Sequence, residues 1–100
     1  MKLGILVNKE RHLREIIEIT MAAVSKGHRV NIFVVEEGVN ILSNPDFIRL
    51  HEINGVRISF CDYSSKELNI FKENIPEEII CGSQMNNAAM VHESDRVIVL

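Results

Sequence analysis

Leu3-Gly4-Ile5-Leu6-Val7 and Val30-Asn31-Ile32-Phe33-Val34-Val35 are short, mainly apolar segments, as expected for strands buried on both faces. Between them an apolar residue recurs every three or four positions, which predicts an amphipathic helix. The residues of this stripe are Leu13, Ile16, Ile17, Met21 and Val24. Gly27 follows the stripe, as is typical of a helix C-terminus. The order strand, helix, strand decides the fold, because it predicts a βαβ unit with a right-handed crossover.

The next segment repeats this alternation. Gly38 opens a predicted loop, and Asn44-Pro45-Asp46 predicts a helix start, with Asn as the N-cap and Pro in the first turn. Phe47 and Leu50 give this short helix its buried side. Residues 56–61 then alternate between apolar and polar, which predicts a third strand ending at or next to Cys61.

The last part of the chain predicts two more strands and one more helix. Residues 71–78 are charged and interrupted by Pro76, so they are expected to be irregular. Ile79-Ile80-Cys81 predicts a brief buried strand, Gly82-Ser83 the turn and N-cap of a helix, and residues 96–100 a closing strand. The face of that helix predicted to be buried carries Met85, Ala88, Ala89 and His92, with Asn86, Asn87 and Glu93 more exposed.

Strands alternating with helices predict an α/β fold of three layers, α/β/α, with a mostly parallel sheet of about five strands in a flavodoxin-like arrangement. No internal repeat or linker interrupts the pattern, so residues 1–100 are predicted to form a single domain.

Composition excludes several classes of protein. The chain is 46% hydrophobic and 25% charged, with only five Gly and two Pro, which excludes a disordered chain. Its net charge of −3 and its scattered Lys and Arg residues do not predict nucleic-acid binding. No apolar run approaches the length of a membrane span or of a signal-peptide core. We therefore expect a cytoplasmic protein whose two cysteines are reduced thiols.

Cys61 is the strongest candidate for chemistry. It ends a predicted strand, at the edge of an open α/β sheet where ligands collect. Ser64-Ser65-Lys66-Glu67 fits a capping box, so a short helix is predicted to begin three residues after the cysteine. The positive end of a helix stabilises a thiolate, Lys66 would add to this effect, and Asp62 would oppose it. The alternative is that Cys61 is a small core residue.

Cys81 also follows a predicted strand, so it is a possible second thiol that resolves Cys61, or else another core residue. No pair of ligands with metal-binding spacing is present, and no metal is expected. Gly38-Val39-Asn40 could shape a pocket wall at the same edge of the sheet. Nucleotide or flavin binding there rests on fold analogy alone, because the phosphate-binding glycine patterns are missing.

Three segments carry a resemblance to a known family. Residues 61–70 resemble the active-site segment of the DsrE/DsrF-like sulfur-relay proteins, in which a cysteine ends a strand and small residues follow. Residues 82–100 are similar to the closing helix and strand of that family, and residues 27–33 to its first passage from helix to strand. The resemblance implies a DsrE-like fold.

The resemblance also implies a function. Cys61 would accept sulfur as a persulfide and pass it to a partner thiol, with Ser64, Ser65 and Lys66 as supporting residues and no cofactor. Sulfur donor and acceptor proteins are the implied partners, and the implied assembly is a homo-oligomer, a trimer or a hexamer.

This chain departs from the family pattern at two positions. It has Leu68 and Asn69 where the family usually has Arg and Gly, so a positive charge is lost near the cysteine. Asn69 can still adopt the left-handed conformation that a helix-ending Gly supplies. The alternative to sulfur transfer is a non-catalytic oligomeric or small-ligand-binding module of the same fold.

Overall fold

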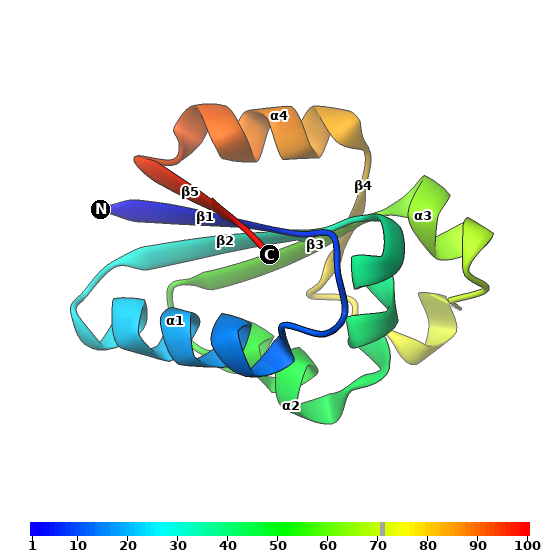
Figure 1. The fold of residues 1–100 in the computed structure, drawn as a ribbon, viewed down its shortest axis with the longest axis horizontal. Helices are drawn as coiled ribbons and strands as arrows, with labels where there is room; N and C mark the ends of the chain where they lie inside the picture. The colour runs from blue at the N-terminus through cyan, green and yellow to red at the C-terminus, as the bar shows by residue number, and fades with distance from the viewer. Residues whose placement is uncertain (71) are drawn as a thin grey trace.

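The apolar segments pair into one parallel sheet in the computed structural model, which describes residues 1–70 and 72–100. The strands are β1 (Lys2–Val7), β2 (Arg29–Val34), β3 (Val56–Cys61), β4 (Ile80–Gly82) and β5 (Arg96–Val99). Their order is β4-β3-β2-β1-β5, and every neighbouring pair is parallel. Figure 1 shows the strands running between two layers of helices.

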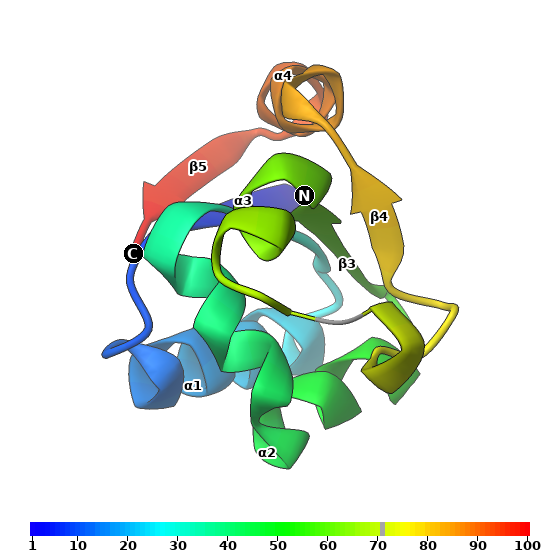
Figure 2. The same cartoon turned by 90° about the vertical axis from the view of Figure 1, so that its right-hand side faces the viewer.

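Helices cover the two faces of the sheet unequally. They are α1 (Leu13–Ser25), α2 (Pro45–Ile48), α3 (Asp62–Glu67) and α4 (Gln84–Glu93), with 3₁₀ turns at η1 (Glu36–Ser43), η2 (Arg49–Glu52) and η3 (Lys72–Asn74). α1 and α2 lie on one face and α4 alone lies on the other, while α3 stands beyond the carboxyl end of β3 (Figures 1 and 2).

The three-layer α/β/α architecture with a five-stranded parallel sheet is therefore confirmed. The flavodoxin-like arrangement holds only for the layers, because flavodoxin has the strand order 2-1-3-4-5. Here β2, β3 and β4 each join the sheet beside the strand before them, and only β5 returns to pair with β1.

The main core fills the space between the sheet and the α1 and α2 layer. Its fully buried residues include Ile5 of β1, Ile16 of α1 and Phe47 of α2. The predicted start of α2 is confirmed, since the Asp46 N–H donates to the side-chain oxygen of Asn44 over 2.9 Å. Gly27 ends α1 with a φ of +83°, a left-handed conformation that costs a glycine little.

The expected loop at Gly38 is instead the 3₁₀ turn η1. A Cβ on Gly38 would collide with the backbone carbonyl oxygen of Val7, so only glycine allows this close approach of η1 to β1. Gly38 and Val39 are both buried. They attach η1 to the core and do not form the wall of an open pocket.

The opposite face has a much smaller core, formed by Phe33, Val35, Cys61 and Met90 with Leu6 packed against them. Met90 is the only buried residue of α4. The predicted apolar face of this helix is wrong, since Met85 is 82% exposed and Ala88, Ala89 and His92 are exposed as well.

Contacts at the N-terminus of α4 explain why a different face of the helix is turned toward the sheet than the one predicted. The predicted N-cap at Ser83 is confirmed, because its hydroxyl accepts the Met85 N–H over 3.2 Å. The Ser83 N–H in turn donates to the side-chain oxygen of Asn86 over 2.8 Å. Asn86 also packs on Gly82, where a Cβ would lie 2.6 Å from it, so this polar side of the helix is turned toward β4.

The connection from β3 to β4 has little regular structure, as predicted. Phe71, the first residue of the predicted irregular stretch, lies outside the described residues. Lys72–Asn74 form one 3₁₀ turn, and Ile79 is buried just before β4. Across the described residues, no helix combines the length and apolar character needed to cross a bilayer.

Candidate functional site

Cys61 lies at the junction of β3 and α3. It is the last residue of β3 and occupies the N-cap position of α3, which begins at Asp62. The predicted helix start at Ser64, three residues further on, is therefore wrong. The Ser64 hydroxyl accepts the N–H of Glu36 over 2.9 Å, and the Ser65 hydroxyl donates to the carbonyl of Asp62 over 2.8 Å. Both serines lie inside α3 and fasten it in place, and neither caps it.

The Cys61 side chain is enclosed by apolar residues. Cys61 is 4% exposed and belongs to the small core under α4, beside Phe33, Val35 and Met90. Lys66, which was expected to help stabilise a thiolate, instead forms an ion pair of 3.1 Å with Asp62. Burial, rather than charge, therefore dominates the surroundings of this thiol.

Cys81 has the opposite surroundings. It is exposed, and its thiol donates to the Asp62 carboxylate over 3.3 Å. Lys72 lies 2.9 Å from the same carboxylate oxygen, and Lys66 holds the other oxygen. Sequence reasoning assigned Asp62 to Cys61 and missed Lys72, because no spacing pattern links residues 62, 72 and 81.

Charges decide the protonation of this cluster. Hydrogen bonds from Lys72 and Lys66 hold the pKa of Asp62 far below its usual range. The pKa of Cys81 is raised, first by burial and then by its hydrogen bond to Asp62, while Lys72 partly opposes the shift. Burial and the ionised Asp62 carboxylate thus both favour the neutral form of the Cys81 thiol.

The structure does not bring the two thiols together. Phe60 pairs with Cys81, and Cys61 pairs with Gly82. Phe60 belongs to the core under α1 and α2, whereas Cys61 belongs to the core under α4. Paired residues on neighbouring strands point to the same face, so the two thiols lie on opposite faces of the sheet. Both are free, and this placement does not favour Cys81 as a thiol that resolves Cys61.

A second polar feature lies between η1 and α3, and we call it the acidic hollow. Its volume is about 370 Å³, and it is lined by Glu36, Glu37, Tyr63, Ser64, Glu67 and Leu68. Tyr63 is 72% exposed, and its hydrogen bond to Glu67 raises the pKa of its hydroxyl. Leu68 is 41% exposed. The expected left-handed conformation of Asn69 is confirmed by its φ of +57°.

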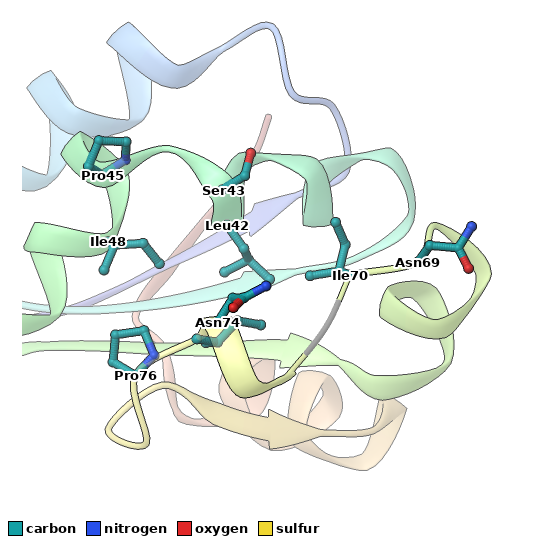
Figure 3. Close-up of a pocket in the computed structure, with 9 residues that line it drawn as sticks. Leu42, Ser43, Pro45, Ile48, Asn69, Ile70, Asn74 and Pro76 are labelled. Carbon is teal, nitrogen blue, oxygen red and sulfur yellow. The ribbon is translucent and has the colours of Figure 1, made fainter.

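Figure 3 shows another hollow, which is lined by other residues. Its volume is about 520 Å³, and its lining comes from η1, α2 and the segments on either side of residue 71. The lining includes Leu42, Ile48 and Ile70, with few polar groups among them, and it contains no cysteine. In the described part of the chain, no three His, Cys, Asp or Glu side chains gather to hold a metal ion.

Comparisons with known proteins agree with this fold. The model of the DsrE/DsrF-like family matches residues 1–100. A protein of unknown function, MTH1491 from Methanobacterium thermoautotrophicum, has a similar structure, with a TM-score of 0.81 at 15% identity over 99% of this chain and 98% of that one. The ychN protein from E. coli has a TM-score of 0.76 at 14% identity over the whole of both chains. The search of curated proteins found no match. The match over the whole length shows that this chain belongs to the DsrE/DsrF-like family.

Proposed function

We propose that this protein carries sulfane sulfur as a persulfide on Cys61 and passes it to the thiol of a partner protein. The observation that carries the proposal is the position of Cys61 at the carboxyl end of β3, inside an apolar enclosure, in a chain of the DsrE/DsrF-like family. Such an enclosure keeps water and stray thiols away from a bound sulfur atom.

The chemistry is thiol exchange in two steps. In loading, the Cys61 thiolate attacks the outer sulfur of a donor persulfide, the donor's sulfur–sulfur bond breaks, and the donor leaves as a thiolate. In unloading, a partner thiolate attacks the outer sulfur of the Cys61 persulfide, and Cys61 leaves as a thiolate. One sulfur atom moves in each step, and no external oxidant or reductant is needed.

In this proposal Ser64, Ser65 and Lys66 do not touch the sulfur, and they support Cys61 indirectly. Ser64 and Ser65 fasten α3 through their hydrogen bonds, and Lys66 neutralises Asp62, which would otherwise disfavour a thiolate at the neighbouring residue. Leu68 supplies no charge. We therefore expect loading to be slower than in relatives that have an Arg at this position.

We also propose that the chain works as a homo-oligomer, a trimer or a hexamer, with separate donor and acceptor proteins. The support is the poorly covered side of the sheet, where Met85, Val91, Val97 and Val99 are exposed large apolar residues of α4 and β5. Apolar side chains gathered on one side are typical of subunit contacts.

Intact mass spectrometry after exposure to glutathione persulfide tests the proposal. We expect the wild-type protein and Cys81→Ser to gain the mass of one sulfur atom, and Cys61→Ser to gain none. A gain that follows Cys81 instead would overturn the assignment to Cys61. No stable gain on either cysteine would overturn sulfur carriage itself.

The burial of Cys61 favours a second candidate, a non-catalytic oligomeric or small-ligand-binding module. Cys61 is 4% exposed, and the two lysines near it in sequence are both held by Asp62. In such a module Cys61 serves only as a packing residue, so Cys61→Ala would leave the oligomer intact and the wild-type protein would not load sulfur.

A further inference from the structure

We propose that the acidic hollow is the docking surface for an acceptor protein whose reactive cysteine is flanked by Arg or Lys. The inference rests on the proposed function, since it names the kind of partner that would receive sulfur from Cys61. The support comes from the charge, exposed side chains, backbone conformation and position of the hollow.

The charge of the hollow is negative and uncompensated. Glu36, Glu37 and Glu67 line it, and none of the three forms an ion pair within residues 1–70 and 72–100. The nearest lysines in sequence, Lys66 and Lys72, are both bound to Asp62. A partner with a cationic side chain would supply the missing charge, and a partner with carboxylates would be repelled.

The exposed side chains of the hollow suit a protein contact. Tyr63 is 72% exposed and Leu68 is 41% exposed, so a large aromatic and a large aliphatic side chain stand beside the carboxylates. Tyrosine is enriched at the centres of protein interfaces. A ring next to carboxylates also suits a guanidinium group, which stacks on aromatic faces while it pairs with acids.

The backbone of the hollow is held in an unusual conformation. Glu36 has a φ of +53°, which costs a non-glycine residue free energy. Its N–H donates to the hydroxyl of Ser64, a buried side chain that also lines the hollow. The backbone that carries the Glu36 side chain is therefore fixed by a specific buried contact, while Glu36 itself stays exposed.

The hollow and the thiol share one edge of the sheet. Val35, the residue before Glu36, packs in the same apolar core as Cys61. Cys61 also occupies the N-cap position of α3, the helix that carries Tyr63 and Glu67. A basic segment seated in the hollow would hold its own cysteine at the same edge of the sheet, where it could reach Cys61 when the cover of that thiol opens.

Unloading to short peptides tests the inference. Three peptides carry one central cysteine flanked by arginine, by glutamine or by glutamate, and each is offered to protein loaded with sulfur on Cys61 in the Cys81→Ser background. We expect the arginine peptide to be fastest and the glutamate peptide to be slowest. The triple variant Glu36→Gln, Glu37→Gln and Glu67→Gln should lose this preference. Each carboxylate is expected to contribute about two- to five-fold to the ratio of the unloading rates of the arginine and glutamate peptides.

A matched control separates the hollow from the net charge of the chain. Glu18→Gln, Glu52→Gln and Glu93→Gln together change the charge by the same amount at exposed positions of α1, η2 and α4. This control should keep the preference for the arginine peptide. An equal loss in both triple variants would overturn the inference, because long-range attraction would then explain the preference.

Two further measurements keep this inference separate from the proposed function. Fluorescence anisotropy of a labelled arginine peptide with serine in place of cysteine reports docking without sulfur chemistry. Docking without loading would overturn the proposed function and the acceptor role but not the surface. Loading without any charge preference would overturn the surface alone. If free methylguanidinium binds as tightly as the peptide, the hollow is a small-cation site and the protein partner is wrong.

Discussion

Cys61 ends β3 and Cys81 is the middle residue of the neighbouring β4, but the surroundings of the two thiols differ in almost every respect. Cys61 is enclosed by Phe33, Val35 and Met90, without a charged partner. Cys81 is exposed and hydrogen-bonded to Asp62. The reactivity of Cys61 is limited by its lack of solvent access, and that of Cys81 by a pKa that burial and Asp62 both raise. Alternation along the strands produces this difference, because neighbouring positions on a strand point to opposite faces.

Solvent access and chemical reactivity are different properties of a thiol, and the two cysteines differ in both. A thiol can be reachable and yet less reactive than a free cysteine, as Cys81 is, because burial and Asp62 raise its pKa. A thiol can also be sheltered until its cover moves, as Cys61 is. A sulfur carrier benefits from the second arrangement, since a sheltered persulfide is lost only when a partner gains access.

The largest effect we expect is the difference in access between the two thiols. In the native protein, iodoacetamide should modify the cysteine of Cys61→Ser on the order of 100-fold faster than that of Cys81→Ser. The reason is that Cys61 reacts only after local opening, at a cost of about 2.7 kcal/mol. Mass spectrometry over time measures both rates, with the denatured variants as controls. Equal rates in the native state would contradict the enclosure of Cys61.

Removing the cover of Cys61 should give the next largest effect. Met90→Ala deletes the only buried side chain of α4 and should cost about 2 to 3 kcal/mol of unfolding free energy. It should also speed alkylation of Cys61 roughly tenfold, as that free energy partly reappears as easier local opening. Met85→Ala is the matched control, since Met85 is 82% exposed and its loss should cost less than about 0.5 kcal/mol. Alkylation of Cys81 should be unchanged in both variants.

Two substitutions should move the reactivity of Cys81 in opposite directions. In the Cys61→Ser background, Asp62→Asn removes a group that raises the pKa of Cys81, so alkylation at neutral pH should become a few-fold faster. Lys72→Gln removes a group that lowers this pKa, so alkylation should become slower. A lower pKa increases the fraction of thiolate more than it decreases the nucleophilicity of that thiolate, so alkylation becomes faster when the pKa falls. The pH dependence of alkylation measures both shifts, and changes of the same sign would show that the cluster is misassigned.

The smallest effect concerns stability and pH. The pKa of Asp62 is lowered in the folded state, so its ion pairs stabilise the protein above the ordinary Asp pKa of about 3.9 and lose this effect as the pH falls below it. The difference in melting temperature between the wild-type protein and Asp62→Asn should therefore shrink between about pH 5 and pH 2. The difference in melting temperature between the wild-type protein and Met90→Ala should stay constant over the same pH range. A pH-independent Asp62→Asn difference would show that the ion pairs contribute nothing.

Much of the fold was predictable, because local patterns encode it. The helix from Leu13, the Asn44 cap and the left-handed Gly27 each depend on a few residues, and each appears as predicted. Within the helix, the predicted stripe fails at Met21, which is 48% exposed, while Thr20 is buried instead. The errors arose where distant residues decide. Ser64 has the pattern of a cap, but its hydroxyl is taken by Glu36, 28 positions away in the sequence.

The buried face of α4 and the surroundings of the thiols also depend on contacts that local sequence patterns do not reveal. Spacing alone favoured Met85 and Ala89 as buried residues, but contacts of Asn86 with Ser83 and Gly82 rotate the helix. Cys61 ends β3 as predicted, whereas Cys81, which was predicted to end a buried strand at residues 79–81, is the exposed middle residue of β4. Their exposure could not be predicted, because it depends on the register of β3 and β4 and on where α4 settles.

The strand order also has a consequence for how the chain folds as it is made. β1 to β4 are neighbours both in the sequence and in the sheet, so each can add to the strand before it as the chain leaves the ribosome. β5 alone must travel back across the sheet to pair with β1, and α4 comes into place with it. We therefore expect the Cys61 thiol to stay uncovered until α4 and β5 have joined the sheet, so that oxidants can reach it during folding.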